Sequence, residues 1–126
     1  SPEGYQLPAA AVRQVTTVAV DGARLRLFSD PADAVAGVDA VYTDTWTSMG
    51  QEHEADVRRQ IFAPYQVNEA IMGLAKPTAL FMHCLPAHRG EEVTADVLES
   101  PASVVFDQAE NRLHCQKALL FMLLVR

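Results

Sequence analysis

The sequence predicts an α/β fold, with a partial, doubly wound parallel sheet followed by a long C-terminal helix. Short strand-like runs alternate with helix-like segments, which favours parallel strands joined by right-handed crossovers. One apolar run, Ala79–Met82, stops abruptly at the reactive side chains of residues 83–90. Because ligands in open α/β sheets bind beyond the carboxyl ends of the strands, we expect the chemistry of the protein there.

The first third of the chain contains a helix, a strand and a second helix start. Pro8 is placed to open a helix over Ala9–Val20, with a strand as the alternative because several of its residues are β-branched. Arg24–Phe28 alternates at period two and reads as a strand. Asp30, as N-cap before Pro31, begins a short helix.

The remaining elements follow the same alternation. We expect strands over Asp39–Thr43, Ala79–His83 and Ser103–Phe106. Helices are expected over residues 53–62 and 65–75, within 91–99 with Thr94 as cap, and from Ala109 to the end.

The end of the last helix, residues 118–125, is apolar on every side, so part of its packing partner is missing or supplied by another chain. We therefore divide the chain into a partial α/β domain at 1–108 and a C-terminal helix at 109–126.

Composition excludes several classes of protein. The 126 residues are 49% hydrophobic with a net charge of −6, which is typical of a globular domain and unlike a nucleic-acid-binding surface. The longest apolar run is far shorter than the ~20 residues that span a bilayer, so we expect no membrane partner. Two cysteines and no signal-peptide pattern predict a cytoplasmic chain. The six glycines form no nucleotide-binding loop.

Cys84 allows three interpretations. Most free cysteines are small buried apolar residues. The nearby His83 and His88 could instead stabilise a thiolate nucleophile. The same three residues could bind zinc, but adjacent strand residues point to opposite faces, so metal is the weakest interpretation.

Two further positions are candidates for ligand binding. Asp44 follows a predicted strand, and Ser48 lies in the loop after it. They either cap backbone amides or present a carboxylate and a hydroxyl to a ligand amine. Arg112 lies near the expected start of the last helix, where a cation is unfavourable unless an anion is nearby, and is therefore a candidate for phosphate or carboxylate binding.

Taken together, these segments resemble the C-terminal part of the ornithine carbamoyltransferase family. The resemblance covers nearly the whole chain and is carried by residues 42–52 (YTDTWTSMGQE), 65–68 (YQVN), 83–94 (HCLPAHRGEEVT), 109–112 (AENR) and 116–118 (QKA). It implies a Rossmann-like ornithine-binding domain and transfer of a carbamoyl group from carbamoyl phosphate to L-ornithine, giving citrulline and phosphate in arginine biosynthesis. It implies no cofactor and no metal.

The resemblance also implies roles for individual residues. Asp44 would hold the ornithine amines, with Ser48 and Met49 lining the same pocket. Cys84 and Leu85 would contact the substrate near the reacting amine, while His83 and Arg112 would meet carbamoyl phosphate. The catalytic set is then Asp44, His83, Cys84 and Arg112, and the Leu85–Pro86 bond is expected to be cis.

The family's carbamoyl-phosphate domain and its Ser-Thr-Arg-Thr phosphate loop have no counterpart in these residues. The opening strand of the ornithine domain is missing too. The last helix is expected to pack on the absent domain, and the intact enzyme to be a homotrimer. We therefore expect the isolated chain to be inactive. The resemblance assigns this chain the ornithine half of the active site. The alternative is that the chain is an inactive fragment or a binding-only module that needs an intact subunit for catalysis.

Overall fold

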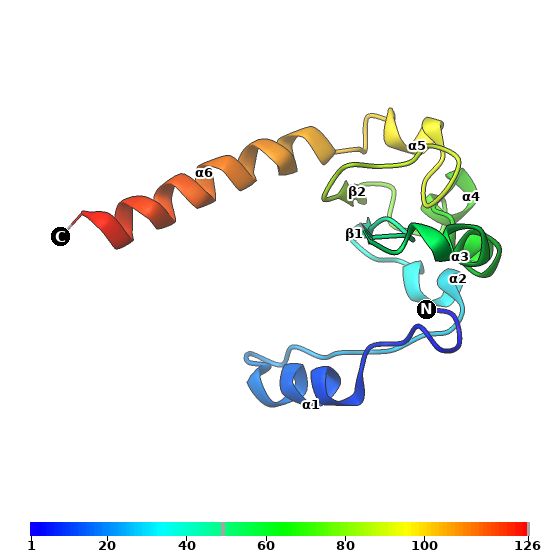
Figure 1. Ribbon diagram of the computed structural model, residues 1–126, viewed down its shortest axis with the longest axis horizontal. Coiled ribbons are helices and arrows are strands. Elements are labelled where there is room, and N and C mark those ends of the chain that lie inside the picture. Colours follow the sequence, from blue (N-terminus) through cyan, green and yellow to red (C-terminus); the bar gives the residue numbers. More distant parts are fainter. Residues whose placement is uncertain (49, 126) are drawn as a thin grey trace.

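The computed structural model describes residues 1–48 and 50–125, which form a mixed α/β fold with two parallel strands and a long C-terminal helix (Figure 1). The helices and strands, in order, are α1 (Ala9–Val18), α2 (Pro31–Val35), β1 (Ala40–Thr43), η1 (Glu52–Glu54), α3 (Ala55–Phe62), η2 (Ala63–Tyr65), α4 (Glu69–Met72), β2 (Leu80–His83), α5 (Ala95–Leu98) and α6 (Val105–Leu124).

The two strands pair in parallel, with Ala40 opposite Leu80 and Thr43 opposite His83. Both strands therefore end at the same edge of the sheet. The residues that immediately follow them, Asp44 and Cys84, emerge side by side, because paired strands lie only about 4.8 Å apart. The expected strands at 39–43 and 79–83 are thus confirmed with their first residues trimmed.

The expected strand at Ser103–Phe106 is wrong. Only one isolated parallel bridge joins Ser103 to Phe81, and it is held by backbone hydrogen bonds from Phe81 N to Ala102 O and from Val104 N to Phe81 O. Helix α6 begins at Val105, four residues before the predicted Ala109. Of the apolar residues expected to continue the strand, Val105 instead forms the buried start of a helix, whereas Phe106 is exposed.

The expected strand at Arg24–Phe28 is also wrong, since this segment has no regular structure. An alternating pattern forms a strand only where another strand edge can accept its backbone hydrogen bonds. Within residues 1–48 and 50–125, β1 pairs only with β2, and its second edge is not joined to residues 24–28.

Most of the predicted helices are confirmed with different ends. Helix α1 is helical rather than extended and ends at Val18, two residues before the predicted end. Asp30 caps α2 by accepting a hydrogen bond from Ala32 N at 2.8 Å, and Thr94 is the N-cap residue of α5.

The helix expected at 65–75 is mostly broken. The short 3₁₀ turn η2 ends at Tyr65, and α4 begins only at Glu69 after a capping hydrogen bond from Ile71 N to the Asn68 side chain, at 3.0 Å. The helix expected at 53–62 forms as η1 and α3.

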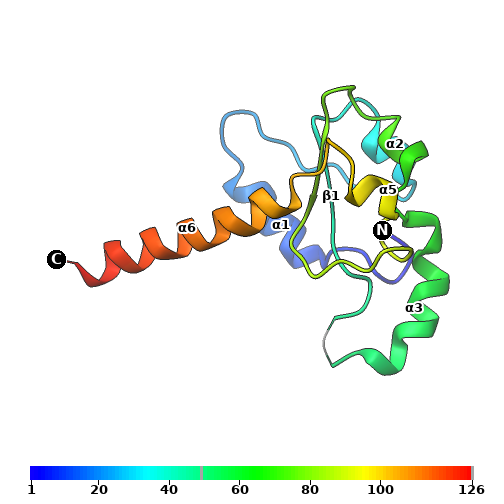
Figure 2. The same ribbon diagram turned by 90° about the horizontal axis from the view of Figure 1, so that it is seen from above.

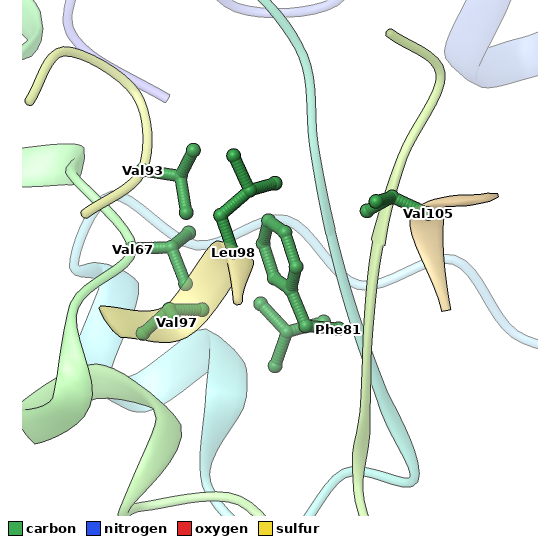
Figure 3. Packing of buried hydrophobic residues seen from close by; sticks show 7 residues of the cluster. Val67, Phe81, Val93, Val97, Leu98 and Val105 are labelled. Atoms are coloured by element: carbon green, nitrogen blue, oxygen red, sulfur yellow. The ribbon is translucent and has the colours of Figure 1, made fainter. Parts of the chain in front are cut away.

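The buried core lies between β2 and the segments that cover it. Phe81 in β2 is fully buried, and its ring lies beside Leu98 of α5 (Figure 3). The other members of the cluster are aliphatic: Val41, Val67, Val93, Val97, Leu98 and Val105. Because these residues come from both strands, α5, α6 and two loops, one aromatic ring organises the whole compact part of the chain.

Helix α6 extends away from this core, as both views show (Figures 1 and 2). Only Val105 of the helix is buried, while Leu119–Val125 are each more than half exposed. The sequence-based expectation that this apolar segment is left without a cover by the rest of the chain agrees with its exposure. No helix in the described part of the chain has the length and apolarity that a membrane span requires.

We predict that Phe81→Ala lowers the free energy of unfolding by about 3–5 kcal/mol, because it removes a fully buried ring from the centre of the core. The matched control is Phe106→Ala, since Phe106 is 70% exposed and its loss should cost less than about 0.5 kcal/mol. Urea denaturation followed by circular dichroism measures both. Equal effects would contradict this account of the core.

Candidate active site

The register of the sheet brings two predicted site residues into contact. The Cys84 thiol donates a hydrogen bond to Asp44 Oδ1 at 3.1 Å, although the residues are 40 positions apart in the sequence. The same oxygen accepts a hydrogen bond from Thr45 N at 2.7 Å. Asp44 is exposed and Cys84 is half-buried. The result is a carboxylate with a fixed orientation and a thiol aimed at it from the neighbouring strand.

This environment favours the neutral thiol. Burial raises the pKa of Cys84, and the hydrogen bond to the Asp44 carboxylate raises it further, since ionisation would place a second negative charge beside the first. The hypothesis that His83 and His88 stabilise a thiolate is therefore not supported by the geometry. Cys84 is best described as a hydrogen-bond donor in this state of the site.

Tyr42 and Gln108 join this group, and the sequence analysis missed both. Gln108 Oε1 accepts a hydrogen bond from His83 N at 3.1 Å, and its amide nitrogen donates to the Tyr42 hydroxyl at 3.5 Å. Interaction with the Cys84 side chain, followed by burial, raises the pKa of Tyr42. The alternation of side chains along a strand could have indicated Tyr42, because it stands two residues before Asp44 and so lies on the same face.

His83 lies on the buried side of the same strand end. Its ring is fully buried, and Nδ1 accepts a hydrogen bond from Leu85 N at 2.8 Å. The ring proton therefore resides on Nε2, which faces Glu92 Oε1 at 3.2 Å. With no exposed surface, this ring orients the loop in the present conformation, and its predicted contact with carbamoyl phosphate remains a prediction.

Glu92 is a third functional candidate that the sequence analysis missed. It is fully buried, and Oε1 accepts a hydrogen bond from His88 N while facing the His83 ring. A buried carboxylate is rarely left without partners, but nothing in the pattern of residues 83–94 showed that this glutamate points inward. It connects the two ends of the loop that carries Leu85. The Leu85–Pro86 bond is cis, as the resemblance implied.

An open cavity of about 540 Å³ lies beside Asp44. Its walls come from the loop after β1, from α3 and from the loop after β2. The lining residues are Asp44, Thr45, Thr47, Ser48, Glu52, Ala55, Arg59, Pro86, His88 and Glu91. Acidic groups outnumber the single arginine, so the cavity suits a ligand that carries an amine. Ser48 lines this cavity, and its contact with ornithine stays a prediction. Met49, predicted to line the same pocket, lies outside the described residues.

A second cavity, of about 850 Å³, shares Asp44 and Ser48 with the first and runs along β1 through Val41 and Tyr42. The loop after β1 therefore lies between two cavities. The larger one follows the side of β1 that carries no second partner strand within residues 1–48 and 50–125.

Arg112 is placed differently from the expectation. Because α6 begins at Val105, Arg112 lies in the third turn of the helix rather than at its start. The argument that a cation at a helix N-terminus needs a nearby anion therefore does not apply to it. Its side chain is exposed, so it remains available to a ligand, and its role in anion binding stays a prediction.

Comparisons with known proteins agree on one family. A family model described as aspartate/ornithine carbamoyltransferase, Asp/Orn binding domain, matches residues 1–123. The chain is 54% identical over 125 residues to an ornithine carbamoyltransferase of Thermococcus kodakarensis, covering 98% of this chain and 40% of that protein. It is 64% identical over 103 residues to one from Methanospirillum hungatei, covering 82% of this chain and 34% of that protein.

The structural comparison agrees. An anabolic ornithine carbamoyltransferase from Campylobacter jejuni superposes with a TM-score of 0.86 at 37% identity, over 98% of this chain and 41% of that one. The chain spans about two fifths of the length of the relatives that match it over 98% of its residues.

We predict that Asp44→Asn lowers the pKa of Cys84, because it removes the carboxylate that disfavours the thiolate. The rate of alkylation by iodoacetamide, measured against pH in a Cys115→Ser background, should then rise at lower pH than in the parent. Asp39→Asn is the matched control, since Asp39 precedes β1 at its other end and pairs with Lys76. An unchanged profile in Asp44→Asn would contradict the assigned contact.

Proposed function

The chain belongs to the aspartate/ornithine carbamoyltransferase family, within its Asp/Orn-binding domain, and on this premise we propose that it supplies the ornithine half of an ornithine carbamoyltransferase active site. The observation that carries the proposal is the contact between Asp44 and Cys84 at the edge of the acidic cavity. The motifs around both residues resemble those of the ornithine enzymes, and the named relatives at 54% and 64% identity are ornithine carbamoyltransferases.

The proposed reaction transfers a carbamoyl group from carbamoyl phosphate to the side-chain amine of L-ornithine. The amine nitrogen forms a bond to the carbonyl carbon, the bond from that carbon to the phosphate oxygen breaks, and the products are citrulline and phosphate. An alkyl amine with a pKa near ~10.4 is protonated at neutral pH, so it must lose a proton before it attacks.

Asp44 and Cys84 have different proposed roles: Asp44 binds the ammonium form of the amine, and Cys84 orients its nitrogen. The Asp44 carboxylate attracts the ammonium form into the cavity, which Ser48 also lines. A carboxylate alone would keep the amine protonated, so another group must take the proton. Since the raised pKa of Cys84 favours the thiol, the departing phosphate is the better acceptor, and the thiol orients the nitrogen together with Leu85.

The tetrahedral oxyanion needs fixed donors, and Arg112 is the proposed cation of this chain that meets it. His83 supports the site by holding Leu85 N through its ring nitrogen. The remaining hydrogen-bond donors for carbamoyl phosphate would come from the family's carbamoyl-phosphate domain, which has no counterpart in these 126 residues. That part would also cover α6, complete a doubly wound sheet along the second edge of β1, and form most of the contacts of a homotrimer.

The competing proposal is a fragment without activity of its own, which at most binds ornithine or associates with intact subunits. The share of the relatives that the chain spans, about two fifths, favours this view of the isolated 126 residues. A citrulline assay separates the two when it is run with and without a separately expressed carbamoyl-phosphate domain from an intact relative. Citrulline formation only when the two parts are mixed supports a half-site. No citrulline formation either alone or in the mixture supports the inactive fragment.

We predict that Asp44→Asn reduces kcat/KM for ornithine about 10- to 150-fold when the chain is complemented with a carbamoyl-phosphate domain. The loss follows from one charge-assisted hydrogen bond to the amine, which contributes about 1.5–3 kcal/mol. Steady-state citrulline formation measures it, with Asp39→Asn as the control that retains parental activity because its side chain pairs with Lys76. Equal losses in both variants would rule out a specific role for Asp44.

A further inference from the structure

The loop between β2 and α5 carries a group that the proposed reaction does not use. Glu92 Oε1 faces His83 and accepts from the backbone of His88, whereas Oε2 is buried and makes no hydrogen bond within residues 1–48 and 50–125. A buried carboxylate oxygen without a partner is costly, so its position calls for a ligand.

Two further residues with potential metal ligands, His88 and Glu91, lie close to this carboxylate. His88 Nδ1 lies 3.7 Å from Glu92 Oε2, and one atom from each of His88, Glu91 and Glu92 falls within 4.8 Å of the others. Two donors bound at about 2.1 Å to one tetrahedral metal ion are roughly 3.4 Å apart, which is close to the observed distance. Glu91 needs a small side-chain movement to join them.

We propose that His88, Glu91 and Glu92 form a binding site for a divalent transition-metal ion of the zinc type. One imidazole and two carboxylates suit such an ion, and two negative charges would balance its charge. Arg59 contacts Oε1 of Glu91 at 3.1 Å and would remain beside the ion as a fixed neighbour, leaving the other oxygen of that carboxylate as the ligand.

This ligand set differs from the one considered from the sequence. His83 is excluded because its Nδ1 accepts from Leu85 N and its Nε2 faces Glu92. The thiol of Cys84 points to Asp44. His88 and Glu91 line the 540 Å³ cavity together with Asp44, so an ion bound by them would lie at the wall of that cavity.

The proposal does not depend on the proposed reaction, and metal binding tests it directly. The 126-residue chain, freed of metal by chelation, is titrated with zinc chloride alone in a calorimeter and with cobalt chloride in a spectrophotometer. We expect one equivalent of zinc to bind. His88→Ala should weaken that binding at least tenfold, and so should Glu91→Gln, which alters only half-buried surface and keeps the test valid if Glu92→Gln fails to fold.

His114→Ala is the matched control. His114 lies 3.3 Å from Glu110 on the exposed face of α6 and offers a similar pair of atoms without a buried carboxylate, so its removal should leave zinc affinity unchanged. Bound cobalt should show visible d–d bands without a thiolate charge-transfer band. The proposal is overturned if His88→Ala retains parental affinity, if His114→Ala abolishes binding, or if a thiolate band places the ion on a cysteine.

Discussion

The in-register parallel pairing of β1 and β2 is the constraint on which the rest of the site depends. Thr43 and His83 lie opposite each other, so Asp44 and Cys84, which follow them, lie side by side. The carboxylate and the thiol, 40 positions apart in the sequence, therefore form a hydrogen bond. A shift of one residue in this register would send Asp44 or Cys84 to the opposite face. Phe81 fixes the register from within, since its buried ring packs against α5 while its backbone binds the segment that leads into α6.

A second set of contacts gives the loop after β2 its shape. The Leu85 amide donates to the His83 ring, and Glu92 ties that ring to the backbone of His88. Both side chains are fully buried, so their polar atoms must find partners inside the protein. The exposed part of the loop can therefore carry functional groups without relying on contacts of its own. Two of these buried atoms, His83 Nε2 and Glu92 Oε2, make no hydrogen bond within the described part of the chain.

What the sequence could predict was whatever local pattern and chemistry determine. The apolar run before His83 located the strand end, Asp30 before Pro31 located a helix start, and the motif at 83–94 located the loop that carries the candidate site. The sequence analysis failed where the outcome depends on a partner far along the chain. Arg24–Phe28 has the pattern of a strand but no edge to pair with, and Ser103–Phe106 has apolar residues that a helix start uses equally well. The burial of Glu92 likewise follows from tertiary packing, which no local pattern reveals.

The electrostatics of the cavity explain why half a site is a reasonable description of this chain. Asp44, Glu52 and Glu91 line it with a single arginine, and that arginine is already paired with Asp56 and Glu91. Such a surface attracts an amine and repels a phosphate, so under the proposed function carbamoyl phosphate would need donors from elsewhere. The apolar end of α6 is exposed in the same chain. A single covering domain with a basic phosphate site would resolve both deficits, because it would bury the apolar helix and bring a cationic surface opposite the acidic cavity.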